Sequence, residues 1–170
     1  MKKIISSAFI LLGFALNSNA QATATATATA TIVTPISISK TADMNFGNVA
    51  VSASVAGTVI LAPAGTRTTG GAGGVTLPAT AGTVAAAAFT VNGSGSYTYA
   101  ITLPSTAVTL TRASGSETMT ATAFTSTPNA TGTLSSGTQN LTVGATLNVA
   151  AGQVAGVYTS GNFNVTVNYN

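Results

Sequence analysis

The stretch Phe163-Asn-Val-Thr-Val-Asn-Tyr-Asn170 alternates apolar and polar side chains at every position. Successive side chains of a β-strand point to opposite faces, so this pattern predicts a strand with one apolar and one polar face. The apolar face carries Phe163, Val165, Val167 and Tyr169. Such a strand either closes part of its own sheet or presents an edge to another protein. Both interpretations remain open from this stretch alone.

Short alternations of the same kind recur along the chain, separated by Gly, Pro, Asn and Ser. The predicted strands are residues 44–46, 57–61, 75–77, 85–91, 97–103, 108–111, 119–124, 141–143 and 147–149. No segment repeats apolar residues at helical spacing over several turns. Many short strands at fairly even spacing are typical of antiparallel sandwiches and barrels. The predicted fold is therefore all-β, an antiparallel Ig-like or pilin-like β-sandwich.

The segments between these strands contain residues that favour turns. Residues 63–74 and 125–137 are rich in Gly and Thr and are predicted as surface loops. Asn92-Gly93-Ser94-Gly95 predicts a hairpin turn, since Asn-Gly readily adopts the positive φ angles that tight hairpins require. The strand after this turn is expected to place four side chains on one apolar face: Tyr97, Tyr99, Ile101 and Leu103.

Residues 1–20 have the pattern of an export signal. Lys2 and Lys3 form a positive start, an apolar stretch covers residues 4–16, and small residues precede Gln21 where a signal peptidase cleaves. The apolar stretch is shorter than the roughly 20 residues that span a bilayer. No later segment is long and apolar enough to predict a transmembrane helix. We therefore expect a cleaved signal peptide and an exported protein, in the periplasm in transit and then at the cell surface or outside the cell.

Charged residues make up 4% of the chain, whereas ordinary soluble domains carry roughly 25%. Beyond the predicted signal, Lys40, Arg67 and Arg112 oppose Asp43 and Glu117, which leaves a net charge of +1. Nucleic-acid binding needs clustered basic side chains that displace counterions, and these three are scattered. Nucleic acid is therefore excluded as a partner. A surface of Thr, Ser, Asn and Gly repels other copies weakly and permits close association.

The sequence contains no His and no Cys. The usual general base and thiol nucleophile are therefore missing, as are the ligands of common zinc sites. Asp43 and Glu117 are the only acidic side chains, and two isolated carboxylates are more typical of surface charge than of a glycosidase or calcium site. The Gly-rich residues 70–74 lack the strand, helix and Lys of a phosphate-binding loop. We predict no enzymatic activity, no cofactor and no metal.

An Ala-Thr dipeptide repeats five times over residues 22–31 and leads into Ile32-Val-Thr-Pro-Ile-Ser-Ile-Ser39. If this segment is extended, one face carries Ala22, Ala24, Ala26, Ala28, Ala30, Ile32, Ile36 and Ile38. A dipeptide repeat specifies the facing of each side chain but not the register, because a slip by two residues regenerates the pattern. One interpretation is a low-complexity tail that is disordered up to Ile32. The other is a flexible strand that awaits a partner.

Several motifs are distributed over nearly the whole predicted domain. They are Pro35-Ile-Ser-Ile-Ser-Lys-Thr-Ala-Asp-Met-Asn-Phe-Gly47, Phe89-Thr-Val-Asn-Gly93, Tyr97-Thr-Tyr-Ala-Ile-Thr-Leu-Pro104, Val143-Gly-Ala-Thr-Leu147 and Ala151-Gly-Gln-Val-Ala-Gly-Val-Tyr158. Together with residues 163–169 they resemble the family called domain of unknown function 4402 (DUF4402). This resemblance implies an exported bacterial β-rich domain and brings no known activity.

The C-terminal segment combines Gly156-Val-Tyr158, fourteen residues before Asn170, with the alternating stretch that follows. It is similar to subunits of chaperone–usher fimbriae, and Asn45-Phe46-Gly47 adds a likeness to the spore coat U type. In those subunits the last strand pairs with a periplasmic chaperone, and a neighbour's N-terminal extension completes the sandwich. The resemblance implies an assembly interface that includes Gly156, Phe163, Val165, Val167 and Tyr169, and a donor strand at residues 22–38. The chain lacks the fimbrial cysteines, and its repeat carries smaller apolar residues than donor strands normally do.

We expect three parts: a signal peptide (residues 1–20), an Ala/Thr-rich extension (21–34) and a β-sandwich domain (35–170). The first functional hypothesis is an exported structural subunit of a surface filament or fimbria-like assembly built by β-strand addition. Its partners are other copies of itself, a periplasmic chaperone and an outer-membrane usher. The alternative is a monomeric exported binding module that recognises a glycan or surface through its loops. Ice binding is a further interpretation of the Thr spacing, although the repeat covers only the extension and not the core.

Overall fold

The computed structural model describes residues 21–170, which contain strands and no helix. The predicted signal peptide, residues 1–20, lies outside the described residues. The strands are β1 Ser37–Ala42, β2 Ala50–Val51, β3 Gly57–Leu61, β4 Arg67–Gly70, β5 Val75–Thr76, β6 Ala87–Asn92, β7 Thr98–Thr102, β8 Val108–Arg112, β9 Thr118–Thr127, β10 Thr131–Thr133, β11 Thr138–Val149, β12 Tyr158–Ser160 and β13 Thr166–Tyr169. Every strand pairing is antiparallel. The all-β antiparallel prediction is confirmed.

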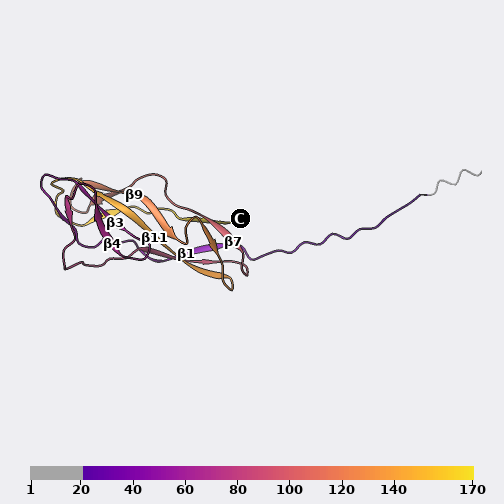
Figure 1. Ribbon diagram of the computed structural model, residues 1–170. Coiled ribbons are helices and arrows are strands. Elements are labelled where there is room, and N and C mark those ends of the chain that lie inside the picture. Colours follow the sequence, from indigo (N-terminus) through magenta and orange to yellow (C-terminus); the bar gives the residue numbers. More distant parts are fainter. Residues whose placement is uncertain (1–20) are drawn as a thin grey trace, which may run out of the picture. The chain divides into compact units, whose positions relative to one another are not determined.

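The longest strand, β11, organises the main sheet (Figure 1). One edge of β11 pairs with β9, and the opposite edge pairs first with β6 and then, beyond Gly144, with β3. A Cβ at Gly144 would meet the backbone of residues 61–63, including Ala62 C at 2.8 Å and Pro63 N at 2.9 Å. Only glycine allows this close approach, so the position where the partner changes requires it.

The strands form three separate sheets. The main sheet follows the path β1-β6-β11-β9-β8-β12, and β3 and β4 continue it beside the second half of β11. A smaller sheet has the order β10-β7-β13, and β2 pairs with β5. Strands β1 and β12 end the six-strand path, and β13 ends the smaller sheet. Each of these three strands therefore has one edge without a strand partner among residues 21–170.

Two hydrophobic clusters make the core of the described domain. The first cluster is built from buried residues of β3, β9 and the second half of β11, joined by Phe46 and Val75. The second cluster combines β6 and the first half of β11 with Tyr99 of β7, Val167 of β13 and Leu134. The second cluster thus holds side chains from both the main sheet and the smaller sheet. Its burial removes apolar surface from water, which stabilises the contact between the two sheets.

Tyr99 is the largest fully buried side chain of the second cluster. Its hydroxyl donates to Gln139 Oε1 at 2.7 Å, and the same oxygen accepts the backbone N–H of Thr133 at 2.9 Å. The buried phenol is therefore satisfied, as buried polar groups generally are. Burial raises the pKa of Tyr99 above its ordinary value, because the charged form loses its hydration.

The structure corrects several predicted strands. Residues 44–46 form no strand, and only Asn45 makes an isolated bridge, to Ala85. Residues 141–143 and 147–149 belong to one strand, β11, because Gly144 lets the chain continue against the backbone of β3. Tyr97 does not share the buried face of Tyr99: it is 50% exposed and precedes the first residue of β7. The strand at 57–61 was predicted with its observed bounds.

Two predicted loops and one predicted turn also differ from the structure. Residues 63–74 contain β4, which extends the sheet beside β3, and residues 125–137 contain the end of β9 and all of β10. The hairpin prediction at Asn92-Gly93 is wrong, because β6 and β7 pair with different partners in different sheets. The positive φ of this segment occurs at Gly95. The segment is a connection between sheets and not a hairpin.

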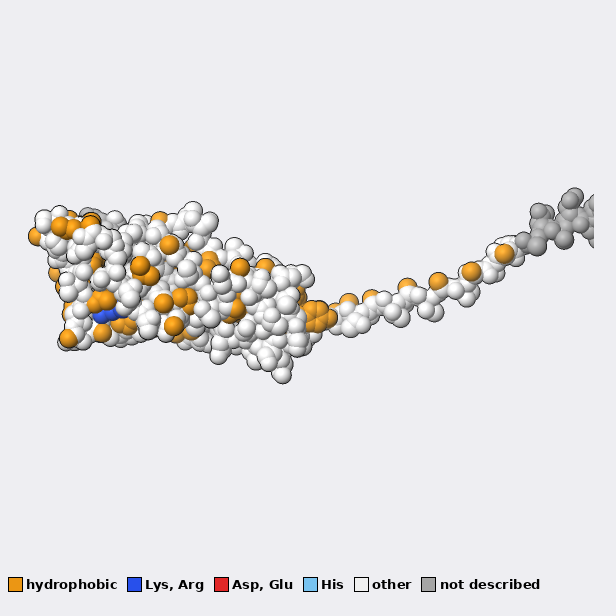
Figure 2. All heavy atoms as spheres, viewed as in Figure 1, with side chains coloured by type: hydrophobic (Ala, Val, Ile, Leu, Met, Phe, Trp, Pro, Cys, Tyr) orange, Lys and Arg blue, Asp and Glu red, His pale blue; other side chains and the backbone are white. Residues whose placement is uncertain are grey.

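The chain divides into the units Met1–Ile32 and Val33–Asn170. The described part of the first unit, residues 21–32, has no assigned strand, and each of its residues is exposed. Ile32 is 93% exposed. Figure 2 shows the hydrophobic side chains of this segment recurring at intervals between the others. We call residues 21–32 the extension.

Candidate functional site

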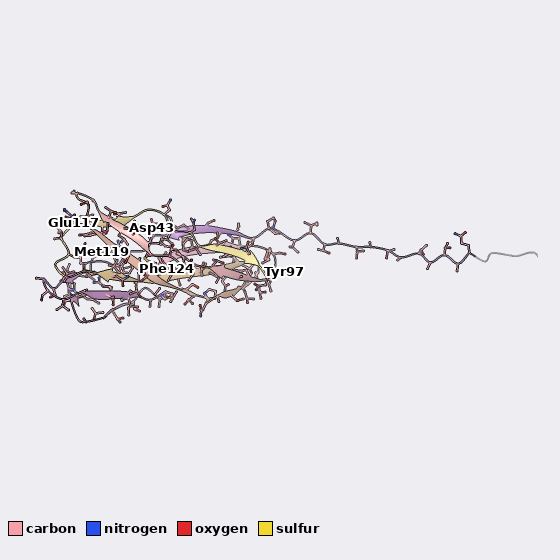
Figure 3. The ribbon with its side chains drawn as sticks, turned by 90° about the horizontal axis from the view of Figure 1, so that it is seen from above. Asp43, Tyr97, Glu117, Met119 and Phe124 are labelled. Atoms are coloured by element: carbon pink, nitrogen blue, oxygen red, sulfur yellow. The ribbon has the colours of Figure 1, made fainter. Side chains whose placement is uncertain are left out.

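The main sheet carries a large groove on one face. Every strand of the six-strand path contributes to its lining, for example through Ile38, Phe89, Leu147, Met119, Leu110 and Tyr158. The groove has a volume of about 1320 Å³. Figure 3 shows two lining residues, Met119 and Phe124, along β9 between Glu117 and Tyr97. Clefts for small molecules occupy roughly 300–1,000 Å³, so this groove is large for such a ligand.

Alternate residues of a strand line the groove because successive side chains point to opposite faces. On β8 the groove is lined by Val108 and Leu110, while Thr109 between them is exposed and does not contribute. On β1 it is lined by Ile38, Lys40 and Ala42. The groove is therefore a surface of the sheet itself, and its floor consists mainly of partly buried apolar side chains.

The first rim consists of β1 and the segment that follows it, residues 43–51. Arg67 of β4 holds this segment, because its guanidinium donates to the carbonyl oxygens of Phe46 and Asn48. A further hydrogen bond runs from Arg67 Nη2 to Ala81 O at 3.4 Å. Gly47 has a φ of 67°, and a Cβ there would meet Arg67 Nη1 at 3.0 Å and the side chain of Val84 at 2.7 Å. Strand pairing holds both ends of this rim, and the guanidinium of Arg67 adds hydrogen bonds to the backbone carbonyls between them.

The second rim consists of residues 153–165, including β12. The Tyr158 hydroxyl donates to Val154 O at 2.7 Å and accepts from Gln153 Nε2 at 2.8 Å. Val154 and Val157 also line the groove, and 44% and 72% of their surface is exposed to solvent. Phe163 packs on Phe124 with ring centroids 5.3 Å apart.

Gly156 lies in this second rim with a φ of 154°. A Cβ at Gly156 would meet Cδ of Arg112 at 2.9 Å. Arg112 in turn donates from Nε to Glu117 Oε2 at 2.7 Å. This hydrogen bond holds the pKa of the Glu117 carboxyl below its usual range and raises that of Arg112. Glycine therefore lets the rim pass close to an ion pair.

Charge is sparse around the groove. Among the lining residues the charged side chains are Lys40 and Asp43, which pair with each other at 2.6 Å and are both exposed. Within residues 21–170 no three potential metal-binding side chains lie together. No helix in this part of the chain is long and apolar enough to cross a membrane. The face shown in Figure 2 is largely uncharged. A groove of this character favours an uncharged, partly apolar occupant.

The structure brings four residues of the predicted assembly interface together at this groove: Ile38, Gly156, Phe163 and Val165. Val167 and Tyr169 belong instead to β13, which pairs with β7, and their side chains pack on the second cluster. Ile36 packs on the same cluster. The alanines at 22, 24, 26, 28 and 30 and Ile32 lie in the extension and are exposed. Sequence reasoning did not identify the floor residues, such as Phe89 and Met119.

Tyr169 connects the last strand to the start of the domain. Its hydroxyl accepts the backbone N–H of Ser94 at 2.6 Å and donates to Thr34 O at 2.8 Å. Its ring lies 5.6 Å from that of Tyr97. The position of Thr34, two residues after Ile32, is therefore held by the C-terminal strand.

The comparisons with known proteins gave one match. The model of the family described as "Domain of unknown function (DUF4402)" matches residues 36–169. No curated protein and no solved structure matches the chain. The matched residues include all strands from β1 to β13 and both rims of the groove. The chain belongs to the DUF4402 family.

Proposed function

We propose that this protein is an exported structural subunit whose copies assemble into a surface filament or fimbria-like structure by β-strand addition. The observation that carries the proposal is an unpaired, extended segment in the same chain as a domain with unpaired strand edges. The extension is exposed throughout, and β1 and β12 each have one edge without a strand partner in the described part of the chain. Exposed strand edges promote association unless they are covered.

The fold that this proposal assumes is an Ig-like or pilin-like β-sandwich. Its support is the second cluster, in which Val91 and Leu141 of the main sheet join Tyr99 and Val167 of the smaller sheet. Two antiparallel sheets that share a core in this way are the basic arrangement of a sandwich. An assembled subunit needs no catalytic residue, and the sequence offers neither a His nor a Cys for one.

Export and delivery are parts of the same proposal. The pattern of residues 1–20 directs the chain out of the cytoplasm, and cleavage before Gln21 exposes the extension at the new N-terminus. A periplasmic chaperone and an outer-membrane usher are the implied delivery partners. The second edge of β13 has no strand partner among residues 21–170, and it is the edge that a chaperone strand would cover. N-terminal sequencing of the exported protein tests the cleavage site.

Deletion of residues 21–31 tests the assembly proposal. We expect the chain that starts at Gln21 to form high-molecular-weight species in size-exclusion chromatography with light scattering, and fibres in negative-stain electron microscopy. The deleted chain should remain monomeric with an unchanged far-UV circular dichroism spectrum. Equal assembly by both chains would contradict the proposal.

The second candidate function is a monomeric binding module for a glycan or surface. The observation that favours it is a pocket of about 300 Å³ that is lined by residues 102–106, Asn164 and Thr166. Its hydroxyl and amide groups are suited to hydrogen bonds with sugar hydroxyls. Binding of a monomeric chain on a glycan array, lost in Asn164→Ala, would support this candidate over the first.

A further inference from the structure

We infer that the groove on the main sheet binds a single-chain amphiphile such as a monoacylglycerol. Its hydrocarbon chain lies on the floor, and its uncharged, hydroxyl-bearing headgroup lies at the rims. This inference goes beyond the proposed function and does not depend on it, because it concerns a ligand of one subunit and not a contact between copies. Four observations support it: the backbone pairing of the floor, its lack of unpaired charge, the polar side chains of the rims, and the dimensions of the groove.

The floor of the groove offers an occupant side chains but no backbone partners. Strands β6, β11, β9 and β8 each have a paired neighbour on both edges. Their N–H and C=O groups therefore point along the sheet toward the adjacent strands and not into the groove. A peptide that lies on this floor places its own backbone groups against apolar side chains, and each group left unpaired there costs free energy. A hydrocarbon chain has no such groups, so the floor favours it over a peptide.

The floor is apolar on all four of these strands. Its side chains include Phe89 of β6, Leu147 of β11, Met119 and Phe124 of β9, and Leu110 of β8 (Figure 3). Hydrocarbon that moves from water onto such a surface is stabilised by the hydrophobic effect. The charged residues of the lining, Lys40 and Asp43, already pair with each other. An ionised ligand therefore meets no unpaired opposite charge among these lining residues.

The rims differ from the floor because they carry neutral polar side chains. The first rim contributes Asn48, and the second contributes Thr159, Ser160, Asn162 and Asn164. Hydroxyl and amide groups both donate and accept hydrogen bonds, as the hydroxyl groups of a glycerol or sugar headgroup do. An apolar floor between neutral polar rims therefore matches a molecule that has a hydrocarbon part and an uncharged polar part.

The groove is long enough for a complete molecule of this kind. On β6 the lining reaches Phe89, whose partner on β11 is Leu141, and on β11 it reaches Val149. This interval of eight residues corresponds to about 27 Å at a strand rise of about 3.3 Å per residue. One leaflet of a bilayer, with chain and headgroup, is about 20–22 Å thick. A single extended acyl chain with its headgroup therefore fits along the groove.

The dependence of affinity on chain length tests the hydrocarbon contact. Monooctanoylglycerol and monodecanoylglycerol are titrated, below the concentrations at which they form micelles, into the chain that starts at Gln21. Binding is measured by displacement of the neutral fluorescent probe N-phenyl-1-naphthylamine and by isothermal titration calorimetry. Each methylene group that becomes fully buried tightens binding by about fourfold. We expect the decanoyl ester to bind at least about tenfold more tightly than the octanoyl ester, and equal affinities would overturn the inference.

The headgroup is tested with ligands that share one chain length. Decanoate and decyltrimethylammonium carry opposite charges and are compared with monodecanoylglycerol in the same assay. Bringing an unpaired charge to the groove costs free energy. We therefore expect each ion to bind at least about fivefold more weakly than the glycerol ester. Equal or tighter binding of either ion would overturn the uncharged headgroup.

Two matched pairs of substitutions test the location. Leu110→Lys places a charge on the floor, whereas Thr109→Lys places it on the exposed face of the same strand, outside the lining. Ala155→Trp fills the groove from its exposed rim, and Ala151→Trp adds the same ring outside the lining. We expect the first member of each pair to weaken binding of monodecanoylglycerol by at least about tenfold, and the second to stay within about twofold. The tryptophan pair decides if Leu110→Lys does not fold, and equal affinities within that pair would overturn the groove as the site.

A peptide is the competing occupant, and a synthetic peptide of residues 22–38 serves as its probe. If this peptide displaces N-phenyl-1-naphthylamine and monodecanoylglycerol does not, the inference is overturned. The outcomes also separate the inference from the proposed function. If deletion of residues 21–31 prevents assembly and the glycerol esters do not bind, only the inference fails. If that deletion leaves assembly intact and the esters bind as expected, only the proposed function fails.

Discussion

Substitution of Gly144 by alanine tests the packing that allows β11 to serve two partners on one edge. The added Cβ would lie 2.8 Å from Ala62 C and 2.9 Å from Pro63 N, and it would lie closer still to Leu61 O. These are backbone atoms of the last residue of β3 and of the two residues that follow it, so no side-chain rotation relieves the contact. Overpacking of this kind typically costs about 1–3 kcal/mol. We expect a value near the upper end, about 3 kcal/mol.

The expected decrease in the free energy of unfolding is measurable as a shift in the thermal midpoint, Tm. For a domain of this size, 1 kcal/mol changes Tm by about 2–4 °C. Gly144→Ala should therefore lower Tm by about 6–12 °C in differential scanning calorimetry, with a matching decrease in the urea midpoint.

Gly161→Ala is the matched control for this substitution. Gly161 has no neighbouring atom within 4 Å of an added Cβ and no positive φ. Its substitution restricts only the unfolded chain and should raise stability by about 0.4–1 kcal/mol. A Tm of Gly144→Ala within about 2 °C of the unsubstituted protein would refute the reasoning about the contact between β3 and β11.

Three further substitutions test the polar contacts of the domain. Tyr99→Phe removes the buried hydrogen bond to Gln139 and should lower the free energy of unfolding in urea by about 1 kcal/mol. Because the folded-state pKa of Tyr99 is raised, the contribution of its ionisation to the free energy of unfolding is constant below about pH 10 and falls as pH rises through the folded pKa. Tyr99→Phe should remove that fall. Glu117→Gln should lower Tm at pH 6, because the hydrogen bond from Arg112 needs the carboxylate. The difference in Tm between the two proteins should shrink as pH falls through the lowered pKa of Glu117. A difference in Tm that does not depend on pH would argue against the Arg112–Glu117 hydrogen bond as its cause. Tyr169→Phe loses both bonds of its hydroxyl and should cost about 1 kcal/mol. Hydrogen exchange should then be faster at the backbone N–H of residue 94, and an unchanged rate would contradict this role.

The sequence predicted the elements whose signal is local. Alternation at 57–61 and around Val108 and Leu110 indicated strands because a half-buried strand must alternate. The same pattern at 163–169 correctly predicted that Phe163, Val165 and Val167 pack on apolar neighbours, but the strand itself covers only Thr166–Tyr169. Many short alternating segments, together with the absence of helical spacing, predicted the all-β class.

Errors arose where long-range contacts override local preference. Gly144 suggested a break between two strands, but its missing Cβ admits the backbone of β3 and lets β11 continue. Residues 67–70 look like part of a Gly/Thr loop, yet β3 offers them an edge to pair with. Residues 44–46 alternate like a strand, but Arg67 takes the carbonyl of Phe46. No property of these segments alone reveals the partner.

For the candidate site, too, some features follow from the sequence and others only from the tertiary structure. The sequence alone determined that the repeat at 22–31 has an alanine face and a threonine face, because a period of two is a property of any extended chain. It also determined that residues 163–169 carry one apolar face. Only the tertiary structure decided that Phe163 and Val165 line a groove while Val167 packs inside the domain. The physical reason is that alternation specifies a face, whereas the partner of that face depends on how distant strands pair and where the main sheet ends.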